Sequence, residues 1–400
     1  MSTSGEASLV AVVARGVRAA TAVARAWDRG DAVAPVDPDT PPPQLRARLE
    51  QLRATHVDEG DGPRRLTGGR PVPAPVGAVV ATSGTTGQPK AVQLDHTALA
   101  ASARAVHVAI GLAPDDEWLC CLPLHAIAGL AILARSRTVG APVVVHDRFA
   151  VDAVARAPGE GVTLVSLVPT MLRRLLAESA PVERFRTVLL GGGPAPRDLV
   201  DASTGRGAHV ATTYGQTETG GGCVHDGHSL PGVEVRLDEQ REILVRGPVL
   251  MRGYHRDKVA TARAFTPDGW LRTGDVGAID THGRLHVVDR LRDLVITGGV
   301  NVSPTAVERV LLEHPAVVDV CVTGADDPEW GERVVAYVVP IDARTPPSLE
   351  SLRAFGRHRL VAAELPREVR LVPAIPRTTG GKPRRAELRD AERSDPRGTP

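Results

Sequence analysis

The chain has 400 residues, 42% of them hydrophobic and 24% charged, which is enough for one large domain and a smaller one with apolar cores. Its 48 lysines and arginines nearly balance 47 aspartates and glutamates, so overall charge gives no argument for a nucleic-acid partner or an acidic membrane surface. The four cysteines match neither a disulfide framework nor a CxxC metal pattern, and no signal peptide or apolar span is apparent. We therefore expect a cytoplasmic protein without membrane insertion.

Apolar residues recur at helical spacing near the start of the chain. Residues 1–55 are expected to form helical pieces at Leu9–Trp27 and Leu45–Leu52, separated by the proline-rich stretch Val33–Gln44. From Val76 onward, short β-branched runs alternate with longer amphipathic stretches at 96–112, 126–140 and 169–180. The expected strands are Gly77–Thr82, Ala141–His146, Val162–Val168 and Thr187–Leu190. This alternation predicts an α/β fold with substantial parallel sheet.

Beyond Gly232 the pattern changes to short strands and turns, and a separate final module is expected to begin near Arg290. Its predicted elements are a strand at Asp293–Thr297, a helix from Ser303 or Pro304 to His314, and strands at Val317–Thr323 and Arg333–Val339. The charged residues 387–400 are expected to form a disordered tail.

A polar loop follows the strand expected to end near Thr82. The sequence Ala81-Thr-Ser-Gly-Thr-Thr-Gly-Gln-Pro-Lys90 contains four hydroxyl side chains, two glycines and a lysine. Its amides and hydroxyls suit a phosphate group, the glycines allow close approach, and Lys90 adds positive charge. The alternative is an ordinary polar turn between a strand and a helix. The loop is not a GxxxxGK[ST] nucleotide loop, because Ala91 follows Lys90.

The loop resembles the signature loop of the acyl-adenylate-forming (AMP-binding) ligases. Three further segments are similar to motifs of that family and occur in the same order: Thr213-Tyr-Gly-Gln-Thr-Glu218, Gly269-Trp-Leu-Arg-Thr-Gly-Asp275 with Asp289-Arg290, and Pro376-Arg-Thr-Thr-Gly-Gly-Lys382. Four matches in order make a chance resemblance improbable.

This resemblance implies an α/β fold of the acyl-CoA synthetase type. It predicts a large N-terminal AMP-binding domain at residues 1–289, with layered α/β sheets and a distorted β-barrel-like part. A hinge at 290–293, a small mobile α+β C-terminal cap domain at 294–386 and the tail at 387–400 would follow. The usual hinge residue of the family is Asp or Lys, whereas this chain has Arg292, and Gly298-Gly299-Val300-Asn301 departs from the family's Gly-Gly-Glu-Asn pattern.

The resemblance also implies roles for individual residues. Tyr214 would lie on the adenine, Asp275 would accept hydrogen bonds from the ribose hydroxyls, and Arg290 would bind ribose or phosphate oxygens. The residues predicted to bind ATP are Thr82, Ser83, Gly84, Thr85, Thr86, Gly87, Lys90, Gly191, Gly192, Gly193, Thr213, Tyr214, Gly215, Asp275 and Arg290.

The predicted catalytic residues are Thr217, Glu218 and Lys382. Thr217 and Glu218 offer hard oxygens for Mg²⁺ bound with the triphosphate. Lys382 would reach the α-phosphate and the attacking carboxylate, where negative charge accumulates. Structural alternatives remain open: a core tyrosine at 214, a cap or surface ion pair at 218, a turn aspartate at 275 and a solvated lysine at 382.

The implied activity is ATP-dependent ligation of a carboxylic acid to a thiol. The carboxylate attacks the α-phosphate of ATP, pyrophosphate leaves, and the thiol then takes the acyl group from the acyl adenylate. No phosphopantetheine-type Gly-Gly-x-Ser segment follows Lys382, so coenzyme A is the expected acceptor. A homodimer is left open.

The segment Cys121–Ser136 looks most like that of the compact 2-succinylbenzoate–CoA ligases of menaquinone biosynthesis. Ala128, Ile132 and Arg135 would share one helix face, and Arg135 would pair with the ring carboxylate of 2-succinylbenzoate. Arg137 is a rival for this role, and an arginine facing solvent or paired with an aspartate is the structural alternative. His125 is predicted to line the acyl pocket, with a core histidine as the alternative.

Three other functions stay open. The chain could be another aryl- or short-chain acyl-CoA ligase, a stand-alone adenylating enzyme that loads a carrier protein, or a non-catalytic acyl-AMP binding module.

Overall fold

The computed structural model describes residues 5–82, 90–377 and 383–394. Internal contacts divide the chain into two compact units: the first contains Met1–Arg236 and Leu244–Arg272, and the second contains Leu237–Ile243 and Thr273–Pro400. The predicted hinge at 290–293 lies within the second unit, where it is the end of a strand and a short 3₁₀ helix. Hinge motion at these residues stays a prediction.

One sheet of the first unit is formed mainly by the N-terminal part of the chain. Its strand order is β18-β8-β7-β3-β2-β4-β5, parallel among β4, β2, β3 and β7 and antiparallel elsewhere. The strands are β2 (Leu9–Val12), β3 (Ala32–Pro35), β4 (His56–Asp58), β5 (Pro63–Arg65), β7 (Val76–Ala81), β8 (Ala91–Asp95) and β18 (Gly253–Tyr254); β1 (Glu6–Ala7) and β6 (Val72–Pro73) form a separate pair. The helices α1 (Gly16–Asp28), α2 (Pro42–Leu52), α3 (His96–Ile110) and α8 (Lys258–Ala264) belong to the same unit.

The prediction of a helix over Leu9–Trp27 is wrong in its first part. Leu9–Val12 forms β2, and α1 begins only at Gly16. All four residues of β2 are buried, because the strand lies between β3 and β4 in the sheet. A continuous apolar run of this kind suits a strand covered on both faces, whereas a surface helix needs a polar face.

The second sheet of the first unit has the order β10-β9-β11-β12-β13-β14-β15. Its strands are β9 (Trp118–Cys120), β10 (Val143–Val145), β11 (Leu164–Leu167), β12 (Thr187–Leu190), β13 (Val210–Gln216), β14 (Gly221–His225) and β15 (His228–Ser229). Pairing is parallel from β10 to β13 and antiparallel beyond, as predicted for the α/β part. The associated helices are α4 (Ile127–Val139), α5 (Val151–Arg156), α6 (Pro169–Ala177) and α7 (Arg197–Gly205), with 3₁₀ helices η1 (Ala157–Glu160), η2 (Val182–Arg184) and η3 (Thr217–Thr219).

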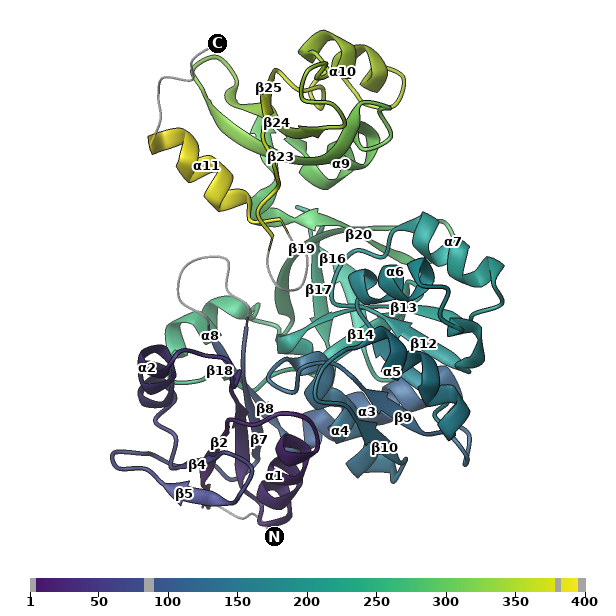
Figure 1. Cartoon of the computed structure of the whole chain (residues 1–400). Helices are drawn as coiled ribbons and strands as arrows, with labels where there is room; N and C mark the ends of the chain where they lie inside the picture. The colour runs from purple at the N-terminus through teal and green to yellow at the C-terminus, as the bar shows by residue number, and fades with distance from the viewer. Residues whose placement is uncertain (1–4, 83–89, 378–382, 395–400) are drawn as a thin grey trace. The chain divides into compact units, whose positions relative to one another are not determined.

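Helices and sheets of the first unit alternate in layers (Figure 1). The helices α3 and α4 pack against each other; α3 contacts β7, β8 and β14, while α4 contacts β9, β10 and β14. These two helices therefore lie between the two sheets. On the second sheet, an apolar core joins residues of α5, α6 and α7 to β11 and β12. The side chains of α4 from Leu130 to Arg135 are consequently buried, whereas Arg137 near the end of the helix is exposed.

A third sheet has the order β16-β17-β19-β20, and the boundaries between the two units fall within its strands. Its elements are β16 (Glu234–Leu237), β17 (Glu242–Arg246), β19 (Leu271–Ile279) and β20 (Leu285–Arg290), followed by η4 (Leu291–Asp293).

The second unit has its own sheet, in the order β22-β21-β24-β23 with β25 on β24. Its elements are β21 (Val295–Thr297), β22 (Val300–Val302), α9 (Pro304–Leu311), β23 (Val317–Asp327), β24 (Gly331–Pro340), α10 (Leu349–Gly356), β25 (Glu368–Leu371) and α11 (Arg385–Ser394). The predicted strand, helix and two strands of this module are present. Ser303 caps α9 by accepting a hydrogen bond from the Ala306 amide, with Pro304 as its first residue.

The expectation of a disordered tail from Glu387 is wrong for its first part. Helix α11 runs from Arg385 to Ser394, because Leu388 packs into a cluster with Tyr337 and Ile375. Residues 395–400 lie outside the described part of the chain.

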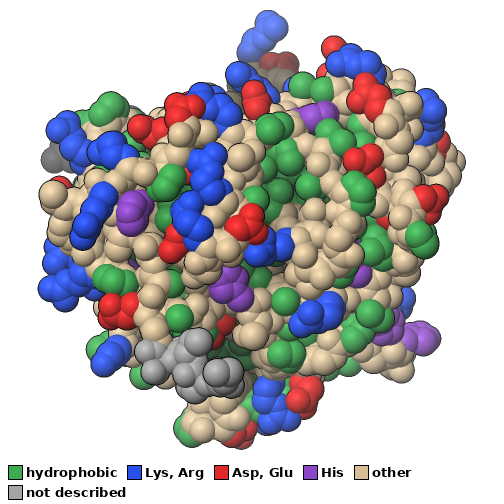
Figure 2. All heavy atoms as spheres, turned by 90° about the horizontal axis from the view of Figure 1, so that it is seen from below, with side chains coloured by type: hydrophobic (Ala, Val, Ile, Leu, Met, Phe, Trp, Pro, Cys, Tyr) green, Lys and Arg blue, Asp and Glu red, His purple; other side chains and the backbone are tan. Residues whose placement is uncertain are grey.

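Two surface properties complete the description. On the face drawn in Figure 2, basic and acidic side chains are interspersed, in line with the near-neutral composition. Among the described helices, none has the length and apolarity needed to cross a bilayer.

Candidate active site

Two predicted motifs meet where the second sheet of the first unit changes from parallel to antiparallel pairing. Gly191–Gly193 follows the carboxyl end of β12, and Thr213 is the point at which β13 leaves its parallel pairing with β12 for antiparallel pairing with β14. A Cβ on Gly191 would lie 2.3 Å from Thr213 Oγ1, so the chain segments approach closely only because residue 191 is glycine. Open α/β sheets commonly bind ligands beyond the carboxyl ends of such strands.

The backbone is irregular at the next two predicted residues. The register of β13 and β14 shifts between Tyr214 and Gly215. A Cβ on Gly215 would lie 2.0 Å from the carbonyl oxygen of Gly221, so no larger residue fits there without moving the strand. Tyr214 pairs in register with Val224 on the neighbouring strand.

Thr217 and Glu218 form η3 immediately after β13. Glu218 is 8% exposed, and its Oε1 accepts a hydrogen bond of 2.9 Å from the hydroxyl of Tyr254. Burial, followed by the nearby Glu218 carboxylate, raises the pKa of Tyr254, so the phenol keeps the proton that it donates. The buried carboxylate therefore has a neutral hydrogen-bond donor from a strand distant in sequence.

Lys90 extends this arrangement. Its Nζ lies 4.5 Å from the centre of the Tyr254 ring, a cation–π contact. We call Lys90, Tyr254 and Glu218 the polar row. Thr82 and Lys90 close the polar loop, because the Thr82 amide donates to the Lys90 carbonyl over 2.8 Å. Ser83, Gly84, Thr85, Thr86 and Gly87 lie outside the described residues.

The loop joins two antiparallel strands, since Ala81 at the end of β7 pairs with Ala91 at the start of β8. The alternative of a turn between a strand and a helix is therefore wrong: α3 begins only after β8, at His96.

Asp275 and Arg290 belong to the second unit. They are register partners on β19 and β20, and Arg290 Nε lies 2.8 Å from Asp275 Oδ1. Asp275 is 3% exposed. The neighbouring Asp289 accepts hydrogen bonds from Ser303 Oγ and the Thr305 amide, so β20 is fastened to the start of α9.

Lys382 lies outside the described residues, but both flanks of its segment are described. Arg377 binds both carboxylate oxygens of Asp319, over 2.7 and 2.8 Å. The Arg384 amide donates to the Pro376 carbonyl, and Arg385 makes a two-oxygen ion pair with Glu308.

The predicted acid-binding residues lie on or beside α4. Ala128, Ile132 and Arg135 are part of the helix, with Ile132 and Arg135 buried and Ala128 half-buried. His125 precedes the helix, half-buried, with Nε2 3.9 Å from Asp37 Oδ2, and burial lowers its pKa. The rival Arg137 forms a 2.6 Å ion pair with Asp28 instead.

Arg135 is buried at 6% exposure without a described carboxylate in ion-pair distance. Its guanidinium lies 5.0 Å from the centre of the Trp118 ring, and Nη1 donates to Ser166 Oγ over 3.4 Å. Nε has no hydrogen-bond partner among the described residues. Burial lowers the pKa of Arg135 to about 10, which leaves the side chain charged at neutral pH. The alternatives of a solvent-facing or aspartate-paired Arg135 are therefore wrong.

Two neutral histidines lie within the electrostatic reach of Arg135. Burial, followed by the charge of Arg135, lowers the pKa of His107 and of His225 to about 4. His107 Nε2 accepts a hydrogen bond from Trp118 Nε1. We call Arg135, Trp118, Ser166 and His225 the buried arginine cluster. It unites α4 with β9, β11 and β14, and it holds one unpaired cation.

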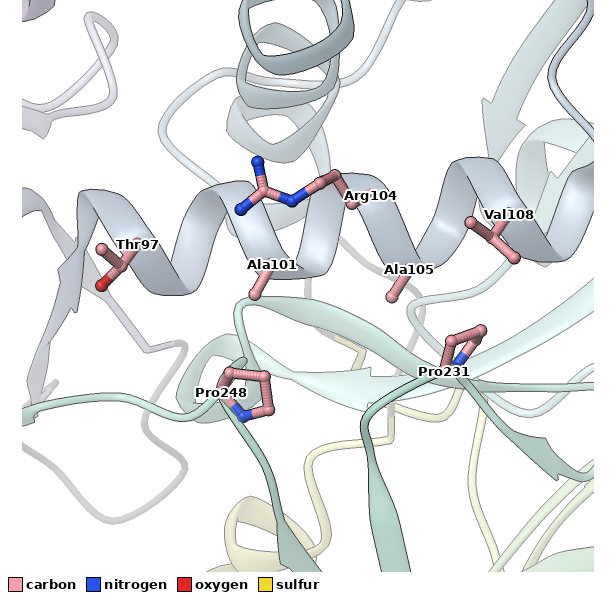
Figure 3. Close-up of a pocket in the computed structure, with 7 residues that line it drawn as sticks. All are labelled: Thr97, Ala101, Arg104, Ala105, Val108, Pro231 and Pro248. Carbon is pink, nitrogen blue, oxygen red and sulfur yellow. The ribbon is translucent and has the colours of Figure 1, made fainter.

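A shallow groove between α3 and the loops that carry Pro231 and Pro248 has a different character (Figure 3). Its volume is about 440 Å³, and it is lined by Thr97, Ala101, Arg104, Ala105, Val108, Pro231 and Pro248. None of these residues belongs to the predicted site.

Comparisons with known proteins bear on this geometry. A family model described as AMP-binding enzyme matches residues 70–255, and one described as AMP-binding enzyme C-terminal domain matches residues 306–382. A probable 2-succinylbenzoate–CoA ligase of Mycobacterium tuberculosis is 41% identical over 325 residues, which cover 78% of this chain and 84% of the relative. The chain belongs to the AMP-binding enzyme family. It is an acyl-adenylate-forming coenzyme A ligase, as the motifs predicted.

Other relatives of this AMP-binding enzyme support the same family assignment. A 2-succinylbenzoate–CoA ligase of Bacillus subtilis is 37% identical over 337 residues, or 78% of this chain and 68% of that one. The solved o-succinylbenzoate CoA synthetase of Bacillus subtilis with its acyl-adenylate intermediate superposes with a TM-score of 0.85 at 30% identity, over 96% of this chain and 88% of that chain. The predicted fold class is thereby confirmed: a large N-terminal domain with layered α/β sheets and a distorted β-barrel-like part, and a small α+β C-terminal domain.

The side chains of this AMP-binding enzyme suit Mg²⁺ that arrives with a nucleotide. Glu218 and Thr217 offer hard oxygens at one short helix, and the described partner of the Glu218 carboxylate is a neutral hydroxyl rather than a cation. Mg²⁺ is commonly held by one or two carboxylates together with phosphate oxygens. Within the described ranges, no group of three or more His, Cys, Asp or Glu is placed to hold a metal by itself. The donor set therefore fits a metal that shares its ligands with phosphates.

Sequence reasoning missed Tyr254 and His225. Tyr254 reaches Glu218 because β18 pairs with β8, the strand that also carries the end of the polar loop. One signal was available: Tyr254 is one of three tyrosines, and it follows Gly253, whose Cβ would lie 2.7 Å from Thr261. The position of His225 depends on strand register, for which its local sequence offers no sign.

Proposed function

We propose that this ligase activates 2-succinylbenzoate and transfers it to coenzyme A, giving 2-succinylbenzoyl-CoA, AMP and pyrophosphate for menaquinone biosynthesis. The observation that supports this acid is the buried Arg135, which has no carboxylate partner within residues 5–82, 90–377 and 383–394. A buried charge is normally paired, because burial without a counter-ion is costly. A second carboxylate on the substrate would supply that partner, whereas a fatty acid or benzoate has none to offer.

The reaction requires charge neutralisation and alignment. A carboxylate oxygen of the succinyl group attacks the α-phosphorus of ATP, the bond to the β-phosphate breaks, and pyrophosphate leaves. The thiol sulfur of coenzyme A then attacks the acyl carbon, its proton passes to solvent, and AMP leaves. Both steps follow from positioning and electrostatics, without a covalent intermediate on the protein.

We assign the nucleotide to the residues predicted from the motifs. The loop from Thr82 to Gly87, with Lys90, would hold the phosphates, while Gly191–Gly193 and Thr213–Gly215 would border the adenine. Thr217 and Glu218 would contact Mg²⁺, which supplies charge neutralisation to the triphosphate when bound. The hydrogen bond from Tyr254 supports this role, because it orients the Glu218 carboxylate before the nucleotide arrives.

The second unit would supply the remaining groups. Asp275 would accept from the ribose hydroxyls, and Arg290, already paired with it, would add a donor to ribose or phosphate oxygens. Lys382 would meet the charge that develops at the α-phosphate. The ion pairs of Arg377 and Arg385 support a fixed base for this segment within its own unit. A rotation at residues 290–293 would separate the adenylation and thiolation steps.

The acyl pocket would be lined by His125, Ala128, Ile132 and Arg135. In this arrangement Arg135 binds the ring carboxylate, so that the succinyl carboxylate is the one left to react.

Pyrophosphate release across a panel of acids, with and without coenzyme A, tests the proposal. We expect 2-succinylbenzoate to be preferred strongly over benzoate, butyrate and long-chain acids, with its thioester formed only when coenzyme A is present. Preference for benzoate or butyrate would contradict the assigned acid. Adenylation without transfer to coenzyme A would instead indicate an enzyme that loads a carrier protein, and inactivity with every acid would indicate a binding module.

A further inference from the structure

His225 is a buried polar residue for which the motifs assign no role. It ends β14, is 7% exposed, and is the register partner of Thr213 on β13. Paired residues in register point to the same face of a sheet, so the two side chains lie side by side. A Cβ built on Gly222 would lie 3.4 Å from Thr213 Oγ1 and 3.5 Å from His225 Nε2. The histidine thus faces the space that glycine leaves open beside the predicted site.

The hydrogen bonding of His225 is incomplete. Its Nε2 is fully buried and has no partner among the described residues, and the same holds for Arg135 Nε. Arg135 lies on α4, which packs against β14, the strand that His225 ends, and the charge of Arg135 acts on the imidazole. Buried polar atoms in native proteins are overwhelmingly hydrogen-bonded, so two unpartnered atoms on packed elements call for a ligand or an ordered molecule that satisfies both. A carboxylate has two oxygens that accept from several donors at once, which suits one guanidinium and one imidazole.

The protonation of His225 is consistent with this role. Burial, followed by the charge of Arg135, lowers its pKa to about 4, so at neutral pH the ring is uncharged and carries one N–H. Arg135 then supplies the only cation among the described members of the cluster, and the imidazole adds a directional donor. The pKa of His107 is lowered to the same value. Its Nε2 already accepts a hydrogen bond from Trp118 Nε1, and this bond supports the indole ring against which Arg135 lies.

We propose that His225 is a specificity-determining residue, whose Nε2–H donates to the second carboxylate of the acid that Arg135 binds. The inference rests on the proposed function, since it requires an acid with two carboxylates. It adds a residue and a direction of hydrogen bonding that the sequence motifs do not contain. A site with a built donor discriminates against an analogue that lacks the acceptor, because the donor then stays buried and unpaired.

The test compares 2-succinylbenzoate with 3-benzoylpropanoate, the same acid without its ring carboxylate, in the full-length enzyme. We expect His225→Leu to reduce the ratio of kcat/KM for the two acids about tenfold, mainly through KM for the diacid. His225→Gln keeps an N–H near the position of Nε2, and we expect it to recover most of the ratio. Equal losses with both acids, or no rescue by glutamine, would show a structural role and overturn the proposal.

Two further arms keep the result interpretable. Should His225→Leu not fold, as judged by circular dichroism, His225→Asn gives the same comparison, because its shorter amide stops before the Nε2 position. Arg135→Met separates the two proposals: if it reduces the ratio and the His225 variants do not, only the role of His225 is wrong. If the unaltered enzyme shows no preference for the diacid, the proposed substrate itself is wrong.

Discussion

The polar row and the buried arginine cluster both bury charge in the first unit, and they do so in opposite ways. The Glu218 carboxylate has a hydrogen bond from Tyr254, which in turn lies against Lys90. Arg135 has an aromatic face and one long hydrogen bond, with no described carboxylate and with Nε left unpaired. In the described part of the chain, the carboxylate of the first arrangement thus has a hydrogen-bond donor, whereas the guanidinium of the second has no anionic partner.

This difference indicates how such an enzyme can share one nucleotide chemistry with many relatives and yet select its acid. Under the proposed function, Glu218 and Lys90 serve the nucleotide and are held by Tyr254 in advance, and preorganisation of this kind costs no rearrangement during the reaction. Under the proposed function, Arg135 selects the acid, because its charge gains a partner when a substrate with a second carboxylate binds. Stability given up at a functional site is a recurring pattern in enzymes.

The largest expected effect lies outside both regions. If the polar row and the arginine cluster only bind and position the substrates, the charge that develops at the α-phosphate must be met by Lys382. We expect Lys382→Ala to reduce adenylation by roughly 10²–10³-fold while sparing thiolysis of preformed acyl adenylate. Pyrophosphate release and thioester formation, assayed separately, measure this split. Lys258→Ala, an exposed lysine at the start of α8, is the control. Equal loss in both half-reactions would count against the separation of steps by domain rotation.

The second largest effect is expected at Arg135, in the buried arginine cluster. We expect Arg135→Met to reduce kcat/KM for 2-succinylbenzoate by about 10²-fold, because a desolvated charge pair is lost. KM for ATP should hardly change. Without ligand, the same variant should unfold at an equal or higher temperature, since it removes an unpaired buried charge. Arg137→Met, which removes the ion pair with Asp28 and the hydrogen bond to the Trp27 carbonyl but leaves Arg135 in place, is the matched control. A large fall in melting temperature with unaltered acid kinetics would assign Arg135 to the core.

A substitution in the polar row should lower stability and raise KM for ATP while leaving the preference among acids unchanged. Tyr254→Phe leaves the buried Glu218 carboxylate without its donor, so we expect the free energy of unfolding to fall by about 1–3 kcal/mol. KM for ATP should rise severalfold, while the preference among acids is retained. Urea unfolding and ATP-dependent kinetics check the two parts. The control is Tyr337→Phe in the second unit, which removes the hydrogen bond to the Leu388 carbonyl. It should lower the free energy of unfolding without changing KM for ATP. A Tyr254 variant that alters acid preference instead would break the distinction between the two regions.

The smallest effect concerns pH. The folded pKa values of His107 and His225, about 4, lie below the ordinary value near 6.5, so the unfolded chain binds more protons between these limits. The free energy of unfolding should therefore fall as pH drops from about 6.5 to about 4. Arg135→Met removes one cause of both shifts, and we expect a shallower fall in chemical denaturation at stepped pH. An identical pH dependence in both proteins would show that Arg135 does not act on these rings.

Much of the fold was accessible from sequence, because the elements concerned are long and regularly patterned. The stretch predicted at 96–112 is α3, and the β-branched run at Thr187–Leu190 is β12. The segment Leu9–Val12 was misassigned because an apolar run flanked by helix-forming residues has the same composition in a buried strand and a buried helix. Only pairing with both β3 and β4 decides between them.

The candidate site could be predicted from the sequence only in part. The motifs assigned Thr213–Glu218 and Arg135 to the candidate site from residue types and order that the local sequence carries, and the roles of these residues stay predictions. They could not show that Arg135 lacks a carboxylate partner among the residues that the structure describes, because that depends on what β9, β11 and β14 place around α4. Tyr254 and His225 were missed for the same reason. Each acquires its position from strand pairing, Tyr254 from the pairing of β18 with β8 and His225 from the register of β14 on β13.

The most direct measurement is the ratio of kcat/KM for 2-succinylbenzoate and 3-benzoylpropanoate in the unaltered enzyme, read as coenzyme A thioester at saturating ATP. The two acids differ only in the carboxylate that Arg135 is proposed to bind. The account predicts a preference for the diacid of roughly 10²-fold or more. Equal use of both acids, or preference for the monoacid, would contradict it.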